Sequence, residues 1–451
     1  MSVEVTETGL NLIPAGYKQT EVGVIPEDWE IFSLGQSIAK TQLGGNYKNS
    51  EHDTGQPLIK MGNLDRGFVK LSKQEFIIGN ASESDLLNYG DVLFNTRNTL
   101  ELVGKVAIWK NELPKAYFNS NLMRISFKED LVSSNLFMNA LMNSERFIKA
   151  LSDIAIGTTS VAAIYNRDLF LIKVALPTKK EQTAIANALS DVDALISKLE
   201  NLIAKKQAIK TATMQQLLTG RTRLPQFALR EDGSKKSTKK SELGEIPEDW
   251  EVVNIGDLGQ VDPENLGSTT SPDYEFNYVS LEQIEKGVLV GTTRTIFRNA
   301  PSRARRVLKK GDILVSTVRP NLMSHYFVQH EVNDLICSTG FSVIRFFEEK
   351  LCPGYLYQHL FSSVINNQIE MLISGSNYPA INSGDVKQLK VQIGSVEEQT
   401  AIATILSDMD KEIQALKQRL SKTYQIKQGM MQELLTGKTR LIKPSKEVIH
   451  E

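Results

Sequence analysis

The feature that most limits how this 451-residue chain can fold is an internal repeat. The segment GVIPEDWE at 23–30 returns as GEIPEDWE at 244–251, and GDVLFNT at 90–96 returns as GDILVST at 311–317, both 221 residues later. EQTAIANALSDVDALI at 181–196 returns 217 residues later as EQTAIATILSDMDKEI, and LLTG at 217–220 returns with the same offset at 434–437. Four matches in the same order indicate a tandem duplication, so the same fold must be built twice.

Each repeat begins with a region of mixed character. Apolar runs such as VLFNT and LMRISF in the first copy, and DILVST and FSVIRF in the second, lie between Gly, Asn and Pro turns and predict strands. Amphipathic segments at 133–151 and 353–372 predict helices between the strands. The expected fold is therefore α+β, with a mixed α/β globular domain in each repeat.

Each repeat ends in a segment that predicts one long helix. T-x-x-E at 178–181 and S-x-x-E at 395–398 are capping boxes at matched positions, and Gly220 and Gly437 suit the residue that ends a helix. Between them, apolar residues follow the alternating four- and three-residue spacing of a coiled-coil seam. The seam residues are Ile185, Leu189, Val192, Ile196, Leu199 and Ile203 in the first copy, and Ile402, Leu406, Met409, Ile413, Leu416 and Leu420 in the second.

Two such seams in one chain are expected to pair with each other, because the chain itself supplies a high effective concentration. We favour an antiparallel coiled coil, since a parallel pair would crowd the two domains at one end. The expected organisation is an N-terminal arm at 1–16, domains at 17–177 and 242–394, helices at 178–220 and 395–437, a polar linker at 221–241 and a tail at 438–451.

Composition and missing motifs exclude several classes of protein. No apolar run approaches the ~18 residues of a membrane span, and the N-terminus lacks the pattern of a signal peptide. Cys337 and Cys352 are too few for a disulfide framework or a cysteine zinc site, so we expect a soluble chain in a reducing compartment.

The tripeptide GKT at 437–439 looks like the end of a P-loop, which would bind nucleotide phosphates. However, Gln432 stands where that motif needs its first glycine, and the preceding residues are helical. We interpret the tripeptide as a helix end, with Lys438 and Arg440 placed where the helix dipole favours cations. H-E-x-x-H, G-x-S-x-G and N-P-P-[YFW] are absent and the five histidines are scattered, so no catalytic residue, metal site or cofactor is expected on this chain. The acidic pairs before Trp29 and Trp250 are interpreted as turns with a buried anchor.

The net charge of −1 means that any nucleic-acid contact needs local positive charge. Residues 291–320 supply it, with eight cations against one acid, Asp312. Arginine suits phosphates and guanine edges, and Asn, Ser and Thr in polar loops suit base edges, although ordinary turns explain any single loop equally well. The candidate DNA-binding residues are Arg97, Asn98, Asn119, Asn121, Thr158, Thr159, Ser160, Asn166, Arg167, Arg294, Arg298, Arg303, Arg305, Arg306, Arg319, Asn321, His325, Ser376, Asn377, Tyr378 and Asn382.

In combination, these features resemble the specificity subunit of type I restriction–modification systems. The resemblance rests on I-P-x-x-W before each domain and on the EQ-x-x-I-A helix that ends in LLTG after it, and it covers nearly the whole chain. It implies a non-catalytic, cytoplasmic, prokaryotic protein whose two target recognition domains read the halves of an asymmetric, bipartite site in double-stranded DNA. It also implies two docked methyltransferase subunits that use S-adenosylmethionine, and restriction subunits that use ATP and Mg for translocation and cleavage.

Two other classes stay open from the residues alone. A coiled-coil scaffold that presents two protein- or glycan-binding domains is supported by the near-zero net charge. An enzyme with a site assembled across both domains is disfavoured by the motif search.

Overall fold

The computed structural model describes residues 13–158, 160–347, 350–373 and 379–442, and these form two compact units. The first unit combines the chain up to Glu200 with the chain from Arg419 onward, and the second unit runs from Asn201 to Gln418. Each unit therefore holds one globular domain, the start of the helix that follows it, and the end of the other repeat's helix. The sequence-based division kept each helix whole and did not anticipate this exchange.

The domain of the first unit contains two large sheets and smaller groups of strands. The larger sheet has the order β4–β13–β9–β11–β7 and is antiparallel except between β11 and β7, and the smaller has the order β12–β6–β8–β5. The strands of the larger sheet are β4 (Ile38–Leu43), β13 (Leu122–Phe127), β9 (Val92–Asn95), β11 (Val106–Ile108) and β7 (Gly67–Phe68), and those of the smaller are β12 (Tyr117–Phe118), β6 (Pro57–Ile59), β8 (Glu75–Ile77) and β5 (Asn49–Ser50).

The continuous apolar run of β9 has a simple cause: both faces of its sheet are covered. Val92 and Phe94 join the core formed with helices α2 and α3, whereas Leu93 joins a second core on the opposite face. Alternate side chains therefore enter different cores, and both sets are apolar. The helices of this domain are α1 (Leu34–Ser37), α2 (Asn135–Met142), α3 (Glu145–Ile154) and α4 (Asn166–Leu169), and further strand pairs are β1 (Tyr17–Thr20) with β2 (Gly23–Pro26) and β3 (Glu30–Ser33) with β16 (Lys173–Leu176).

The second unit repeats this plan with two four-stranded sheets. Their orders are β20–β29–β26–β27 and β24–β21–β28–β25. The strands are β20 (Gly259–Val261), β29 (Phe341–Phe346), β26 (Ile313–Ser316), β27 (Tyr326–Phe327), β24 (Thr293–Ile296), β21 (Glu275–Val279), β28 (Leu335–Ser338) and β25 (Ala304–Val307), with the pairs β17 (Thr238–Ser241) and β18 (Gly244–Pro247), β19 (Glu251–Asn254) and β30 (Lys390–Ile393), and β22 (Ile284–Glu285) and β23 (Val288–Leu289). The helices are α6 (Pro353–His359), α7 (Ser363–Leu372) and α8 (Ser383–Gln388).

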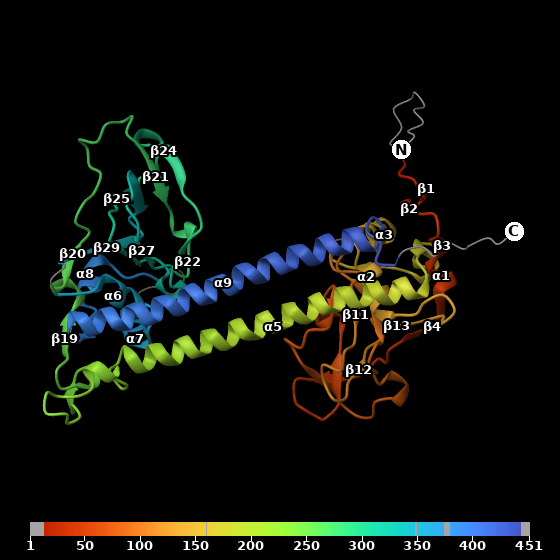
Figure 1. Cartoon of the computed structure of the whole chain (residues 1–451), viewed down its shortest axis with the longest axis horizontal. Coiled ribbons are helices and arrows are strands. Elements are labelled where there is room, and N and C mark those ends of the chain that lie inside the picture. The colour runs from red at the N-terminus through yellow and green to blue at the C-terminus, as the bar shows by residue number, and fades with distance from the viewer. Residues whose placement is uncertain (1–12, 159, 348–349, 374–378, 443–451) are drawn as a thin grey trace. The chain divides into compact units, whose positions relative to one another are not determined.

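The two long helices are α5 (Lys179–Leu217) and α9 (Val396–Leu434), each of 39 residues (Figure 1). In the first unit, Lys427 Nζ lies 2.6 Å from Asp193 Oδ1, and the Tyr424 hydroxyl donates to Glu200 at 2.6 Å. Residue numbers therefore fall along α9 as they rise along α5.

The second unit shows the same direction of pairing. Lys206 Nζ lies 2.7 Å from Glu412 Oε1, and Lys210 Nζ lies 2.5 Å from Asp410 Oδ1. These two lysines interrupt the first apolar seam, and the carboxylates of α9 give them partners. The predicted antiparallel pairing is thus confirmed within each unit.

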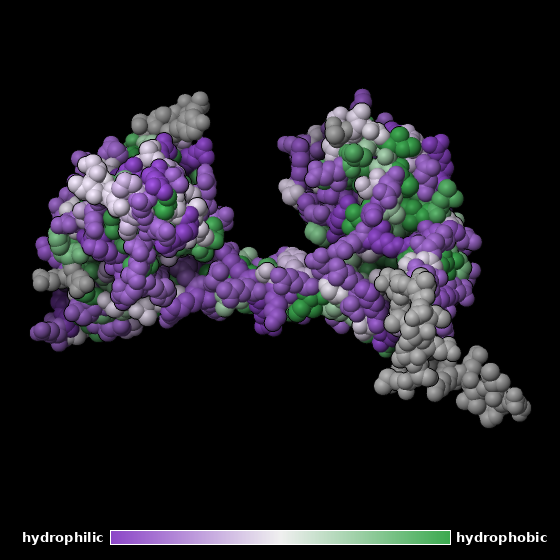
Figure 2. Space-filling view, turned by 90° about the horizontal axis from the view of Figure 1, so that it is seen from above, coloured by the Kyte–Doolittle hydropathy of each residue, from purple (hydrophilic) through white to green (hydrophobic). Residues whose placement is uncertain are grey.

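The seam positions face inward as predicted. Ile185 and Leu189 join the core of the first domain together with Leu434, so the first turns of α5 pack against a domain as well as against a helix. Ile402 and Leu406 do the same in the second domain with Leu217. Val192, Met409, Leu416 and Leu420 are partly exposed, and the other predicted seam residues are buried. Figure 2 shows hydrophilic residues over much of the exposed helix surface.

Three predicted segments differ from expectation or lie partly outside the described residues. Residues 221–241 were predicted as a linker, but strand β17 starts inside them at Thr238, and Arg230 forms an ion pair with Glu248 at 2.6 Å. Residues 1–12 of the predicted arm and 443–451 of the predicted tail lie outside the described residues. No helix within the described ranges is long and apolar enough to cross a membrane.

Candidate nucleic-acid interface

In each unit, a threonine directly after the central strand anchors the loops that carry the predicted polar residues. Thr96 follows β9, and its N–H and its hydroxyl both donate to the carbonyl of Asn121 at 3.0 Å. Thr317 follows β26, and its N–H and hydroxyl donate to the carbonyl of Gly340 at 2.9 and 2.8 Å. Because the same contact recurs in both repeats, the loops beside it occupy equivalent places in the two units.

A three-stranded sheet gathers the predicted loops of the first unit. Its order is β10 (Arg97–Asn98), β15 (Ala162–Ala163) and β14 (Ile156–Gly157), with Arg97 opposite Ala163. Segments some sixty residues apart in the chain are thereby brought to one edge of the domain. Thr158 and Ser160 lie in the turn between β14 and β15, where their hydroxyl oxygens are 3.2 Å apart. The guanidinium of Arg97 is exposed and has no partner among the described residues.

The corresponding surface of the second unit is built from three loops. Val318 forms an antiparallel bridge with Ala380, and the N–H of Arg319 donates to the carbonyl of Pro379 at 2.8 Å. The N–H of Thr339, next to the anchoring Gly340, donates to the carbonyl of Arg303 at 2.8 Å. Arg303, Thr339 and Arg319 therefore belong to one continuous surface.

Comparison with known proteins decides the family. The model of the family described as "Type I restriction modification DNA specificity domain" matches twice, at residues 26–211 and 247–423. The chain belongs to this specificity family. A putative type I restriction enzyme MjaX specificity subunit from Methanocaldococcus jannaschii is 27% identical over 442 residues, which covers 94% of this chain and 97% of the relative.

Other comparisons agree with this specificity-family assignment. The type I restriction enzyme MjaVIII specificity subunit of the same organism is 26% identical and covers 92% of this chain and 94% of its own length. Among solved structures, the type I restriction–modification S subunit from M. genitalium has a TM-score of 0.58 at 14% identity, over 90% of this chain and 96% of that one. This last likeness shows that the fold is shared.

The basic run of this specificity protein is less positive than its sequence suggested. Most of its cations have acidic partners that lie outside the run or on a neighbouring strand. The pairs are Arg294–Glu275 at 2.9 Å, Arg298–Asp273 at 2.8 Å, Arg306–Asp262 at 2.5 Å, Lys309–Glu264 at 2.7 Å and Lys310–Glu331 at 3.0 Å. A count of acids within residues 291–320 misses these partners, because they lie elsewhere in the sequence. Glu275, for example, lies on β21, which pairs with the strand β24 that carries Arg294.

Three predicted contact residues of this specificity protein need correction. His325 is fully buried and its Nδ1 accepts the N–H of Ser316 at 3.2 Å, so it belongs to the core. Asn119 is 9% exposed, below the surface on which Asn121 lies. The Arg306 side chain is 13% exposed beside Asp262, which makes it a structural ion pair.

The remaining predicted residues are distributed as follows. Arg305 lies over the ring of Phe297, with 4.7 Å between the guanidinium carbon and the ring centroid. Arg167 is exposed beside Tyr165, and Asn382 caps α8 by accepting the N–H of Asp385 at 3.0 Å. Asn98, Asn166, Arg303 and Asn321 are exposed or partly exposed. Thr159, Ser376, Asn377 and Tyr378 lie outside the described residues.

The two units carry opposite charges at one matched, largely buried position. Leu86 pairs with Tyr117 in the first unit, and Val307 makes the equivalent pair with Ile336 in the second. The residue before each is therefore also equivalent. It is Asp85 in the first unit and Arg306 in the second. Asp85 accepts hydrogen bonds from the Tyr47 hydroxyl at 2.5 Å and from Gln42 Nε2 at 2.9 Å. The frame is therefore repeated, whereas the side chains mounted on it are not.

Proposed function

We propose that this specificity-family protein reads an asymmetric, bipartite site in double-stranded DNA, with each unit reading one half. The main support is that Thr96 and Thr317 make the same contact to a neighbouring loop in the two units. The loops beside this contact occupy equivalent positions in the two domains but have different polar side chains. A repeated frame allows both domains to approach DNA in the same way. Different side chains then select different bases.

The first unit offers apolar as well as polar groups for this role. Figure 2 shows hydrophobic patches on this unit, and its exposed apolar side chains include Ile156, Val161 and Tyr165, which are 51%, 68% and 48% exposed. Val161 and Ile156 flank Thr158 and Ser160 in the chain and suit the methyl group of thymine, while Arg97 suits a phosphate or a guanine edge.

We further propose that this chain catalyses no reaction and acts with partners in the prokaryotic cytoplasm. Two methyltransferase subunits, which use S-adenosylmethionine, would dock on the two equivalent repeats, and restriction subunits would use ATP and Mg. The support is the duplicated frame, since equivalent repeats offer equivalent sites to two copies of one partner.

Selection from a random pool of double-stranded DNA tests the proposal. The full chain is incubated with the pool, with and without its methyltransferase partner, and bound DNA is sequenced. We expect two blocks of selected bases separated by a constant spacer. Arg97→Ala should relax selection in one block and Arg303→Ala in the other. The absence of sequence-selected DNA even with the partner present would contradict the proposal.

A further inference from the structure

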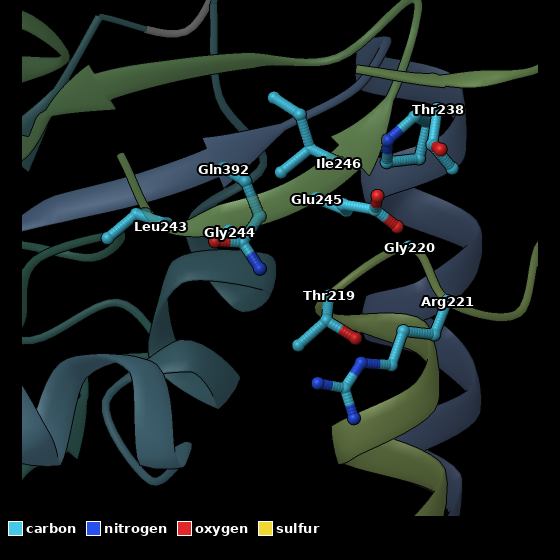
Figure 3. Close-up of a pocket in the computed structure, with 10 residues that line it drawn as sticks. Thr219, Gly220, Arg221, Thr238, Leu243, Gly244, Glu245, Ile246 and Gln392 are labelled. Carbon is cyan, nitrogen blue, oxygen red and sulfur yellow. The ribbon is translucent and has the colours of Figure 1, made fainter. Parts of the chain in front are cut away.

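A pocket of about 410 Å³ in the second unit lies between the end of α5 and the β17–β18 hairpin (Figure 3). Thr219, Gly220 and Arg221 line one side, Thr238 and residues 243–247 of the hairpin line the other, and Gln392 of β30 completes it. The volume falls within the ~300–1,000 Å³ typical of small-molecule sites.

Gln392 lines this pocket but is almost fully buried. The side chain is 2% exposed and its Nε2 donates to the carbonyl of Leu218 at 2.9 Å. Its Oε1 is buried and has no partner among the described residues. The protein itself covers this oxygen, so the polar group that a ligand in the pocket could reach is sought elsewhere.

The first unit shows what fills the same place in the other repeat. Tyr17 pairs with Pro26 in the β1–β2 hairpin as Thr238 pairs with Pro247 in the β17–β18 hairpin. The Tyr17 hydroxyl donates to the carbonyl of Gly437 at 2.8 Å, and Gly437 ends α9 as Gly220 ends α5.

A second substitution between the repeats accompanies the first. Ala175 is the third residue of β16, where β30 has Gln392, so the first unit has a methyl group in place of the glutamine amide. The first unit therefore supplies its own phenol at this place, whereas the second unit has a small threonine.

We propose that the pocket of the second unit binds a phenol group supplied from outside that unit. The ring would lie against Pro247 and Leu243, and its hydroxyl would donate to the carbonyl of Gly220, as the Tyr17 hydroxyl does to that of Gly437. The phenol is either a tyrosine side chain of a partner chain or a free small molecule, because both present the same chemistry.

Titration of the full chain with p-cresol, the analogue of the tyrosine side chain, tests the site. We expect one equivalent to bind by calorimetry, and toluene, which lacks the hydroxyl, to bind at least tenfold more weakly. Thr238→Tyr should abolish binding because the new ring occupies the pocket. Tyr17→Thr should open the matching place in the first unit and add binding there.

Tyr17→Phe is the matched control, because it changes the first hairpin but keeps its ring, and it should leave p-cresol binding unchanged. Failure of p-cresol to bind, or equal binding to the wild-type chain and to Thr238→Tyr, would overturn the proposal.

An assembly experiment with the purified methyltransferase partner distinguishes the two sources of the phenol. This experiment rests on the proposed function. If a tyrosine of that partner occupies the pocket, Thr238→Tyr should weaken assembly at least tenfold and p-cresol should compete with it. Unchanged assembly would refute a partner tyrosine while leaving a free phenol as ligand. DNA selection by the Thr238→Tyr variant without the partner is measured in parallel. This measurement distinguishes a failure of the phenol-site proposal from a failure of the DNA-reading proposal.

Discussion

The guanidinium of Arg440 holds the buried carboxylate of Glu181, with Nε 2.7 Å from Oε1 and Nη2 2.8 Å from Oε2. The same guanidinium binds both oxygens of Asp28, and the indole N–H of Trp29 donates to Glu181 Oε2 at 3.2 Å. The second unit repeats this clasp with Arg223, Glu398, Asp249 and Trp250. Each clasp joins the residues that follow one repeat's helix to the helix start and tryptophan turn of the other repeat.

The clasps are therefore predicted to stabilise the units strongly. Glu181 is 1% exposed, so Arg440→Ala would leave a buried carboxylate whose side-chain donor among the described residues is the Trp29 indole alone. Losing one partner of a buried pair costs about 3–5 kcal/mol. Urea unfolding followed by tryptophan fluorescence should show this loss for Arg440→Ala. Lys438→Ala, at an exposed residue two positions earlier, should change stability by less than about 0.5 kcal/mol.

Alanine substitutions at Gly429, inside α9, and at Gly437, just after it, should have opposite effects on stability. Gly437 has φ +72° and an added Cβ would lie 2.5 Å from Pro26 Cδ, so Gly437→Ala should destabilise by more than about 1 kcal/mol. Gly429 lies inside the helix with open space around it, so Gly429→Ala should stabilise by about 0.5–1 kcal/mol. Melting temperatures of the two variants measure the difference, and equal shifts would contradict the assigned helix end.

The second unit should lose stability in mild acid because it buries two neutral histidines. Burial lowers the pKa of His359 to about 3 and that of His325 to about 4. The unfolded chain takes up these protons near its ordinary pKa of ~6.5, well before the folded chain does. The stabilisation is therefore complete above about pH 6.5 and is lost as pH falls toward these folded values, at up to about 1.4 kcal/mol per pH unit for each histidine.

Urea unfolding at several pH values between 5 and 7, followed through Trp250, measures this slope. His359→Leu should flatten it. His330→Gln is the control, since His330 is exposed and its replacement should leave the slope unchanged. A His359→Leu variant with the wild-type slope would show that the acid sensitivity has another origin.

Salt dependence of DNA binding should separate free arginines from paired ones. The guanidinium groups of Arg97 and Arg303 are exposed and have no partner in the described part of the chain. Each alanine variant should therefore reduce the salt slope by about 0.9 if the arginine contacts a phosphate. Arg294→Ala is the control, because Arg294 already pairs with Glu275 and its slope should change less. Arg306→Ala should lower stability before it alters DNA binding, because Asp262 would lose its cationic partner.

Patterns local in the sequence determined much of this protein. The matched repeats indicated a fold built twice, the apolar runs predicted strands such as β9, and the 4,3 spacing predicted two long helices with apolar seams. The strands and helices depend on neighbours within a few turns of the chain, so periodicity reveals them. The antiparallel direction came from the expected crowding of the domains in a parallel pair. Burial of Trp29 and Trp250 followed from the same kind of local pattern.

Only the tertiary structure decided which distant groups meet. Arg440 has the sequence position of a helix-end cation, yet its partners Asp28 and Glu181 lie hundreds of residues earlier. Asp262 neutralises Arg306, and His325 enters the core although it lies in a polar loop of the sequence. Ion pairs and burial depend on how strands and helices are brought together, and no local spacing records that arrangement.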